Sequence, residues 1–194
     1  MARLREFDEE DAFSKALDVF WHKGLRGTTM LDLASATGIQ RGSLYNAYGD
    51  KEEVFVRAFQ RYAGRFLADV QKALSKPDLR TALTAFFDVS VRTITAGSPS
   101  RGCLSTRTAF DLDEASPRVA ESLKAMLDTL GQLLMSALDT RERRAQLTMP
   151  PEQAVRLIVA TTRGIGVLER VYGDRKSLKL TTAALVNALL KGRK

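Results

Sequence analysis

Residues 24–54 read GLRGTTMLDLASATGIQRGSLYNAYGDKEEV, and this stretch decides the fold. Thr29 precedes an apolar segment and has an acidic residue three positions on, a pattern that predicts the start of a helix. The segment stops at Gly38, a residue typical of helix C-termini. A second short helix is predicted over 41–48, where Gly49 breaks the pattern. Two short helices joined by a tight glycine turn are the plan of a helix-turn-helix.

Helical spacing of apolar residues continues on both sides of this stretch. A longer helix is expected from Asp8, as N-cap, to Gly24, and another from Lys51 to about Leu74. The run 139–148 is polar and is expected to be a loop. Five further helical segments are predicted over 79–94, 101–110, 116–138, 150–172 and 177–190. No stretch alternates as a strand would, so the sequence predicts an all-α fold of about nine helices.

Composition excludes several classes but does not by itself identify a partner. The net charge is +7, yet residues 1–62 carry 9 Lys/Arg and 10 Asp/Glu, while residues 63–194 carry 21 and 13. The basic excess therefore lies outside the helix-turn-helix. Only the placement of a few basic residues within that motif can indicate nucleic-acid binding. Cys103 is the single cysteine, which excludes an internal disulfide. Neither a secretory signal nor a membrane span is expected, and the single cysteine favours a reducing cytoplasm.

The pattern alone leaves a small three-helix bundle as an equal alternative to a DNA-binding motif. The residues themselves resemble the tetracycline-repressor-like (TetR) family over roughly 8–60, through the glycine-threonine entry, the Gly-Ile turn, the Gly-x-Leu-Tyr core and the Asp-Lys-Glu start. The resemblance implies a DNA-binding domain over 1–50 and a helical effector-binding and dimerisation domain over 51–194. It also implies a homodimer on a pseudo-palindromic operator, and a repressor that an unknown small-molecule effector releases.

The resemblance further implies a set of DNA-binding residues in and around the second short helix. Arg41 stands in the exposed first turn, where it could donate two hydrogen bonds to a guanine. Lys51 matches a phosphate-contacting lysine, with a solvated surface lysine as the alternative. Tyr45 matches a DNA-facing tyrosine, although it could also belong to the core. The full set is Thr28, Thr29, Gln40, Arg41, Gly42, Ser43, Tyr45, Asn46 and Lys51.

Two positions depart from the family's pattern, and two arginines before the first helix could add contacts to DNA. Ala47 stands where the family often has a histidine, so a phosphate contact could be lacking. Leu31 is apolar where a polar contact would be plausible, and either touches a thymine methyl or packs. Arg3 and Arg5 precede the first helix and could reach a minor groove. Gly42 lies within a helix, so we expect it to permit close approach of DNA.

The C-terminal part is predicted by resemblance and by spacing, with burial inside one subunit as the alternative reading. The expected effector pocket comprises Phe86, Phe87, Cys103, Phe110, Met126 and Leu130, and polar residues that could orient a ligand are Arg92, Thr106 and Arg163. The expected dimer interface, formed by the last two helices, comprises Ala160, Thr161, Gly164, Val167, Leu168, Leu185 and Leu189. Cys103 is expected to be an inert buried thiol, unless Arg101 or Arg107 stabilises a reactive thiolate.

Catalytic, metal and cofactor sites are not expected. His22 is the single histidine, and no nucleophile–base pair can be built around it. Asp111, Asp113 and Glu114 match no complete cation loop and are predicted to form a solvated linker. Without an acid–base pair an enzyme is disfavoured, and the rival hypothesis is a helical interaction protein or small-molecule carrier that does not bind DNA.

Overall fold

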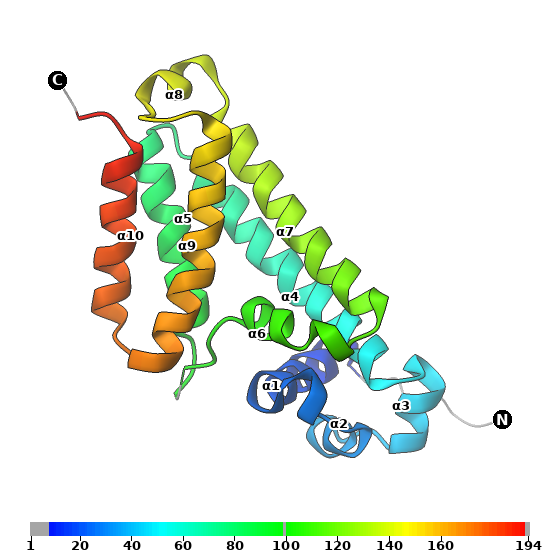
Figure 1. Cartoon of the computed structure of the whole chain (residues 1–194). Coiled ribbons are helices and arrows are strands. Elements are labelled where there is room, and N and C mark those ends of the chain that lie inside the picture. The colour runs from blue at the N-terminus through cyan, green and yellow to red at the C-terminus, as the bar shows by residue number, and fades with distance from the viewer. Residues whose placement is uncertain (1–7, 99, 193–194) are drawn as a thin grey trace. The chain divides into compact units, whose positions relative to one another are not determined.

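The computed structural model describes residues 8–98 and 100–192, with the side chain of Glu114 excepted. Over these residues the chain forms ten α-helices and one 3-10 helix, and no strand (Figure 1). This confirms the all-α prediction. The elements are α1 (Glu9–Gly27), α2 (Met30–Thr37), α3 (Arg41–Tyr48), α4 (Lys51–Leu74), α5 (Leu79–Ile94), α6 (Leu104–Phe110), η1 (Leu112–Glu114), α7 (Pro117–Leu138), α8 (Arg141–Gln146), α9 (Pro151–Tyr172) and α10 (Arg175–Leu189).

The chain divides into two compact units. The N-terminal unit comprises the described residues up to Ala63 together with 107–123, and the C-terminal unit comprises 64–106 and the described residues from Lys124 onward. The first unit therefore extends beyond the boundary predicted after residue 50. Helices α4, α6 and α7 each begin in one unit and end in the other.

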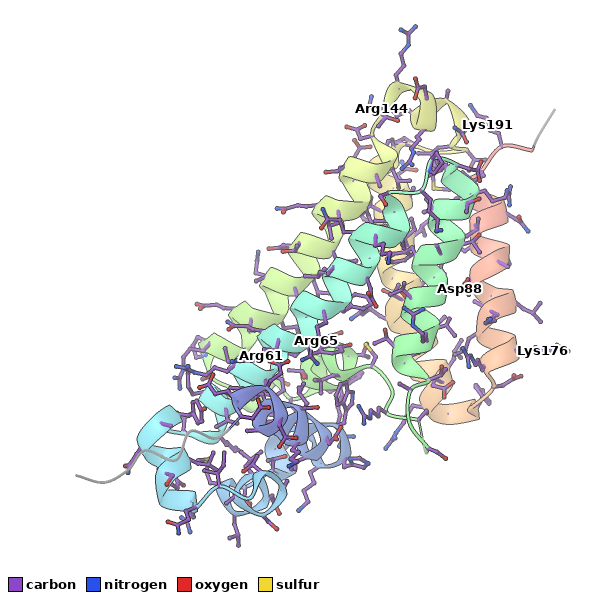
Figure 2. The ribbon with its side chains drawn as sticks, turned by 180° about the vertical axis from the view of Figure 1, so that it is seen from behind. Arg61, Arg65, Asp88, Arg144, Lys176 and Lys191 are labelled. Carbon is purple, nitrogen blue, oxygen red and sulfur yellow. The ribbon has the colours of Figure 1, made fainter. Side chains whose placement is uncertain are left out.

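An aromatic core holds α1 against the first half of α4 in the N-terminal unit. The Phe20 and Phe55 rings meet edge to face with centroids 5.0 Å apart, and both side chains are fully buried. Arg61 of α4 covers this core from outside, with its guanidinium 4.2 Å from the Phe13 ring centroid and an ion pair to Glu9 at 3.0 Å (Figure 2).

The helix ends in this unit follow the local signals in the sequence. The Asp8 carboxylate accepts the amides of the first turn of α1. Thr29 forms the capping box of α2, and Gly38 adopts the left-handed conformation (φ 72°) that ends it. The helical segment of α1 extends three residues past the predicted end at Gly24. That glycine has φ 74° and bends the chain there, so the segment continues only as a short extra turn.

Apolar side chains of α5, α9 and α10 form the core of the C-terminal unit. Phe86 and Leu83 on α5 are fully buried. Ile94, Ile165 and Leu178 belong to one buried cluster to which these three helices contribute. Figure 1 shows α5, α9 and α10 running alongside one another, as their mutual contacts require.

The predicted loop over 139–148 contains the short helix α8, which makes ten α-helices where about nine were expected. Thr140 caps α8 by accepting the Arg143 amide. The Arg143 guanidinium then donates to the carbonyls of Ala137 (2.8 Å) and Lys76 (2.6 Å), so tertiary contacts hold a polar sequence in helical form. Among the helices described, none is both long and apolar enough to cross a membrane.

Candidate functional site

Helix α3 leaves one polar side uncovered. Leu44 (2% exposed) and Tyr48 (8% exposed) anchor the helix in the N-terminal unit. The remaining side of α3, with the residue before it, is exposed, and it carries hydrogen-bonding groups at most positions. This surface, which we call the α3 face, consists of Gln40, Arg41, Gly42, Ser43, Tyr45 and Asn46.

The two tyrosines of α3 occupy opposite environments. Tyr48 donates its hydroxyl to Glu9 Oε1 at 3.1 Å, and burial together with this hydrogen bond raises the pKa of its phenol. Tyr45 is 42% exposed, and the Arg41 guanidinium lies over its ring at 5.5 Å from the centroid. Tyr45 therefore lies outside the core, and its ring steadies the arginine in front of it.

The first turn of α3 presents its groups without internal competition. Gln40 is the N-cap residue, but its side chain makes no capping hydrogen bond. A Cβ added at Gly42 would meet no heavy atom within 4 Å, and the backbone there is not in the left-handed region. Gly42 is therefore required neither by packing nor by backbone conformation within the described chain, which fits a position that a partner approaches closely.

Two residues that were predicted to contact DNA form hydrogen bonds within the chain instead. Thr28 is buried, and its hydroxyl donates to the Gly24 carbonyl at 2.6 Å, so its side chain cannot reach a partner. The Lys51 ammonium donates to the carbonyls of Leu25 (3.0 Å), Arg26 (3.1 Å) and Thr28 (3.0 Å). Because an ammonium has three N–H donors, these carbonyls use all of them, and only the positive charge of Lys51 remains for a phosphate.

Thr29 is exposed, and an acidic residue organises its hydroxyl. Asp32 accepts from the Thr29 amide and hydroxyl at 2.9 and 2.8 Å, and from the Lys23 ammonium. The hydrogen bond from Lys23, followed by those from Thr29, lowers the pKa of Asp32 to about 2. This network fixes the entry to α2, the helix that supports α3.

A connection between α1 and the segment after Thr106 was not predicted. The Arg107 guanidinium donates to the carbonyls of Trp21 (3.0 Å) and His22 (3.3 Å), and Asp111 accepts the Leu25 amide at 3.1 Å. These groups are more than eighty residues apart in the sequence, so no local pattern could have predicted their contact. Asp111 is thus a structural acceptor rather than part of a solvated linker.

Three further predictions concern the same unit. Leu31 is 66% exposed, so it does not pack. His22 is exposed, and its Nδ1 lies 2.6 Å from the Asp18 carbonyl oxygen. Arg3 and Arg5 lie outside the described residues.

The residues predicted to line the effector pocket differ in their solvent exposure. Phe86, Phe87, Met126 and Leu130 are between 0 and 3% exposed and belong to the core of the C-terminal unit. Phe110 is 79% exposed, which is not the enclosed environment expected of a pocket residue, because it occupies the solvent side of a helix of only seven residues. A groove of about 970 Å³ lies between α4 and α5, and its lining includes the polar residues Lys72, Arg80 and Asp88 and none of the residues predicted for the effector pocket.

Cys103 lies in the C-terminal unit immediately before α6 and is half-buried. Its Sγ is 3.2 Å from Ser105 Oγ. The guanidinium that acts on this thiol comes from Arg163 on α9, rather than from Arg101 or Arg107 as the sequence suggested. Arg163 is sixty residues away in the chain, which hides this proximity from any local pattern.

Helix α9 leaves an apolar side uncovered. Its exposed large residues are Leu157, Val167, Leu168, Val171 and Tyr172, the last being 73% exposed. Ala160 and Gly164 are exposed between them, and Thr161 is half-buried. We call this surface the α9 stripe: Leu157, Ala160, Thr161, Gly164, Val167, Leu168, Val171 and Tyr172.

The predicted contribution of α10 to the same surface needs correction at one residue. Leu189 is fully buried within the chain, so its side chain cannot meet a partner. Leu185 is half-buried, and Leu180 is the exposed leucine of this helix at 63%. Among the described residues, no three His, Cys, Asp or Glu side chains group as metal ligands.

Comparison with known proteins agrees with the geometry of both units. The model of the tetR family of bacterial regulatory proteins matches residues 13–58, and that of the tetracyclin repressor-like C-terminal domain matches residues 79–185. The HTH-type transcriptional repressor ComR of Escherichia coli is 28% identical over 151 residues, covering 77% of this chain and 71% of ComR. The uncharacterized HTH-type transcriptional regulator YezE of Bacillus subtilis is 29% identical over 153 residues, covering 76% of this chain and 79% of YezE.

Solved structures share the fold along nearly the whole chain. A cysteine mutant of the TetR family transcriptional regulator CifR, complexed with 26-base-pair operator DNA, is 25% identical, with a TM-score of 0.82 and coverage of 96% of this chain and 99% of that one. The reduced form of E. coli NemR is 16% identical, with a TM-score of 0.83 and coverage of 94% and 97%. The latter likeness concerns the fold alone.

An exposed helix of polar groups on a helix-turn-helix, joined to a larger helical unit, defines a DNA-binding transcriptional regulator. The chain belongs to the TetR family.

Proposed function

We propose that this regulator is a homodimeric repressor that binds a pseudo-palindromic operator through the α3 face and leaves it when a small molecule binds the C-terminal unit. The observation that carries the proposal is the α3 face itself. Six exposed positions between 40 and 46 have polar or small side chains, while the two anchors of the helix, Leu44 among them and Tyr48 after them, are buried. Such a surface has no use inside one chain, but it suits the major groove.

Arg41 makes the main base-specific contact in this proposal. A guanidinium at the first turn of a recognition helix donates to O6 and N7 of guanine, and its position over Tyr45 reduces the freedom it must lose on binding. Gln40, Ser43 and Asn46 offer further donors and acceptors to base edges. The open space at Gly42 lets the helix backbone come close to the groove.

The α9 stripe forms the dimer interface in this proposal. Exposed apolar residues at spacings of three and four, with glycine and alanine between them, let two copies of a helix approach closely. A two-fold pairing would use the same stripe on both copies and give two α3 faces for two half-sites roughly 34–36 Å apart. Leu180 extends the apolar surface onto α10.

Helices that belong to both units transmit the effector response in this proposal. Helices α4, α6 and α7 each begin in one unit and end in the other, so a change in the C-terminal unit can alter the orientation of α3. Two similar proteins support the repressor and operator parts of the proposal, since ComR is a transcriptional repressor and the CifR mutant was solved with operator DNA.

The test is enrichment of genomic DNA fragments by the whole chain at several salt concentrations. We expect the wild type to enrich a palindromic site and Arg41→Ala to lose that enrichment. Lys124→Ala is the control, because it removes one exposed positive charge from α7 of the C-terminal unit. Enrichment of the site with equal strength by all three proteins would reject the α3 face as the surface that reads it. No salt-sensitive enrichment by any of them would favour a helical carrier that does not bind DNA.

A further inference from the structure

The groove between α4 and α5 has two defined ends. The turn over 75–78 joins the two helices and closes one end. Toward the other end, the Arg92 guanidinium of α5 donates to the Asp69 carboxylate of α4 at 3.3 Å and so links the two helices. On α5 the lining runs from Arg80 to Arg92, about 18 Å of helix at about 1.5 Å a residue. With a volume of about 970 Å³, the groove has room for a small molecule.

Three positively charged side chains line the groove near the turn, namely Lys72, Lys76 and Arg80. Both lysines are exposed, and within the described part of the chain neither ammonium pairs with a carboxylate. The Arg80 guanidinium donates to the side-chain oxygen of Asn187, which is neutral. The charges of all three side chains are therefore available to an anion from solution.

The surroundings of the turn do not cancel this positive charge. The free carbonyls at the C-terminus of a helix are partly negative, but here the Arg143 guanidinium donates to the Lys76 carbonyl at 2.6 Å. The Asp78 carboxylate is the N-cap of α5 and accepts the Thr81 amide at 2.8 Å. Arg143 adds one positive charge and Asp78 one negative charge, so this end of the groove keeps its positive excess.

The rest of the groove offers acceptors for neutral hydrogen-bond donors. Asp69 and Asp88 line it farther from the turn, and Thr84 contributes a hydroxyl. Each carboxylate is more than half exposed and pairs with a cation, Asp69 with Arg92 at 3.3 Å and Asp88 with Lys179 at 3.9 Å. A carboxylate has about four acceptor sites, so both can still accept hydrogen bonds from hydroxyl groups.

This division of charge selects among the possible occupants. An acidic peptide along the groove would bring its carboxylates close to Asp69 and Asp88, which repel them. An apolar molecule would meet a lining in which only Ala73, Ala85 and Val89 are apolar. A phosphate ester carries about −1.5 to −2 charges at neutral pH, which more than one cation is needed to balance. A compact phosphate at the turn, attached to a body with neutral hydroxyl groups, therefore matches both parts of the groove.

We propose that the groove between α4 and α5 is the effector site and that its ligand is a phosphorylated sugar or a similar hydroxylated phosphate ester. This inference rests on the proposed function, because the ligand serves as the effector of the regulator. The phosphate accepts hydrogen bonds from Lys72, Lys76 and Arg80, each strengthened by charge. The hydroxyl groups of the sugar donate to Asp88 and Asp69.

Helix α4 connects this groove with the helix-turn-helix. The groove is lined by the last part of α4, while the same continuous helix begins at Lys51 in the N-terminal unit. The contact between Phe20 and Phe55 holds the first part of α4 against α1. A phosphate that draws Lys72 and Arg80 together shifts the end of α4 relative to α5. The continuous helix then transmits this shift to the unit that carries α3.

The first arm of the test is calorimetric titration of the whole chain with glucose-6-phosphate, ribose-5-phosphate and fructose-1,6-bisphosphate. Glucose and inorganic phosphate are the ligand controls. We expect at least one sugar phosphate to bind with a Kd below about 1 mM and at least about tenfold more tightly than either control. Binding of all three no tighter than that of inorganic phosphate would overturn the site. Tighter binding of hexaglutamate than of the sugar phosphates would assign the groove to an acidic protein segment instead.

Variants place the binding in the groove. The double variant Lys72→Gln, Lys76→Gln should bind the sugar phosphate about tenfold or more weakly, because two charge-assisted hydrogen bonds are lost. Asp88→Ala should reduce the advantage of the sugar phosphate over inorganic phosphate. Lys124→Gln, an exposed change on α7, is the matched control and should bind as wild type does. A double variant with wild-type affinity would show that the ligand binds elsewhere.

The second arm measures operator affinity with and without the sugar phosphate, on a fragment recovered by genomic enrichment and with sodium sulfate at equal ionic strength as the control. We expect the ligand to weaken operator binding about tenfold, and the double variant to bind equally under both conditions. Binding in the groove with unchanged operator affinity would overturn the effector role and leave the proposed regulator intact. Absence of selective DNA binding without ligand would reject the proposed function, while the first arm still decides whether the groove binds the phosphate.

Discussion

Helices α3 and α9 both leave one side without intramolecular cover, and the two uncovered sides differ in chemistry. On α3 the exposed groups are a guanidinium, a phenol, amides and a hydroxyl, whereas on α9 they are leucine, valine and tyrosine interrupted by glycine and alanine. A polar exposed side costs little in water and gains by reading base edges. An apolar exposed side is unfavourable in water and is typical of a surface that another protein covers.

Exposure alone does not identify the partner of a surface, but exposure together with the chemistry of the exposed side chains does. The α3 face suits a partner rich in hydrogen-bond donors and acceptors, and the α9 stripe suits a second copy of itself. The two surfaces depend on each other, because two half-sites can be bound together only if two chains are joined.

The largest expected effect comes from a charge placed in the α9 stripe. Val167→Asp should give a monomer, because a carboxylate would be buried without a partner at the pairing surface. Loss of the second reading helix should lower operator affinity about 100-fold or more. Sedimentation and a DNA titration measure both effects, with Ser136→Asp on the exposed side of α7 as the control. A dimeric Val167→Asp protein would show that the stripe has another use.

A smaller loss is expected when Lys51 is replaced by methionine. The change leaves three carbonyls at the end of α1 without their donor, and should lower the free energy of unfolding by about 2–3 kcal/mol. Denaturant melts measure this, and Lys15→Met, which breaks only an exposed i,i+4 ion pair, is the control. If Lys51→Met kept full stability but lost DNA affinity, the phosphate role predicted from sequence would be the correct one.

Replacement of Gly42 by alanine should move stability and binding in opposite directions. Alanine is the better helix former, and no atom obstructs its Cβ, so the free energy of unfolding should rise by about 0.5–1 kcal/mol. Operator affinity should fall because the methyl group occupies the space that the groove would enter. Gly64→Ala, at an exposed and equally open glycine of α4, should stabilise without weakening DNA binding. Unchanged affinity of Gly42→Ala would place the first turn of α3 away from the bases.

The smallest effect concerns pH and the entry to α2. Because the pKa of Asp32 is lowered from 3.8 to about 2, its ionised form favours the folded state, and that contribution is complete above pH 3.8 and lost as pH falls toward 2. The melting temperature of wild type should exceed that of Asp32→Asn at pH 6, and the difference should shrink across this window. Ser35→Ala, which does not titrate, should show no such trend, and a constant difference for Asp32→Asn would argue against the ionic network.

Local signals made much of the fold predictable from sequence. Asp8, Thr29 and Gly38 act on backbone groups within four residues, and the structure confirms each of these helix ends. Helix α8 was missed because its sequence has no apolar periodicity, and it is held by Arg143 reaching carbonyls near residue 76. Where tertiary contacts decide the conformation, a local pattern carries no signal.

The candidate sites were predictable only as far as exposure follows from helical spacing. The polar side of α3 and the apolar side of α9 are visible in the sequence, and the structure exposes both. The buried positions of Thr28 and Leu189, the engagement of Lys51 and the approach of Arg163 to Cys103 depend on residues far away in the chain. These four features could be obtained only from the folded structure.

The proposed function depends most on hydrogen bonds from Arg41 of the α3 face to a guanine. The most direct measurement is a cycle of operator affinities in which wild type and Arg41→Ala bind duplexes whose guanines are replaced, one at a time, by 7-deazaguanine, which lacks the N7 acceptor. If Arg41 donates to N7, the two losses will not add at one guanine of each half-site, and the coupling will be about 1–3 kcal/mol. Additive losses at every guanine would contradict base reading by Arg41.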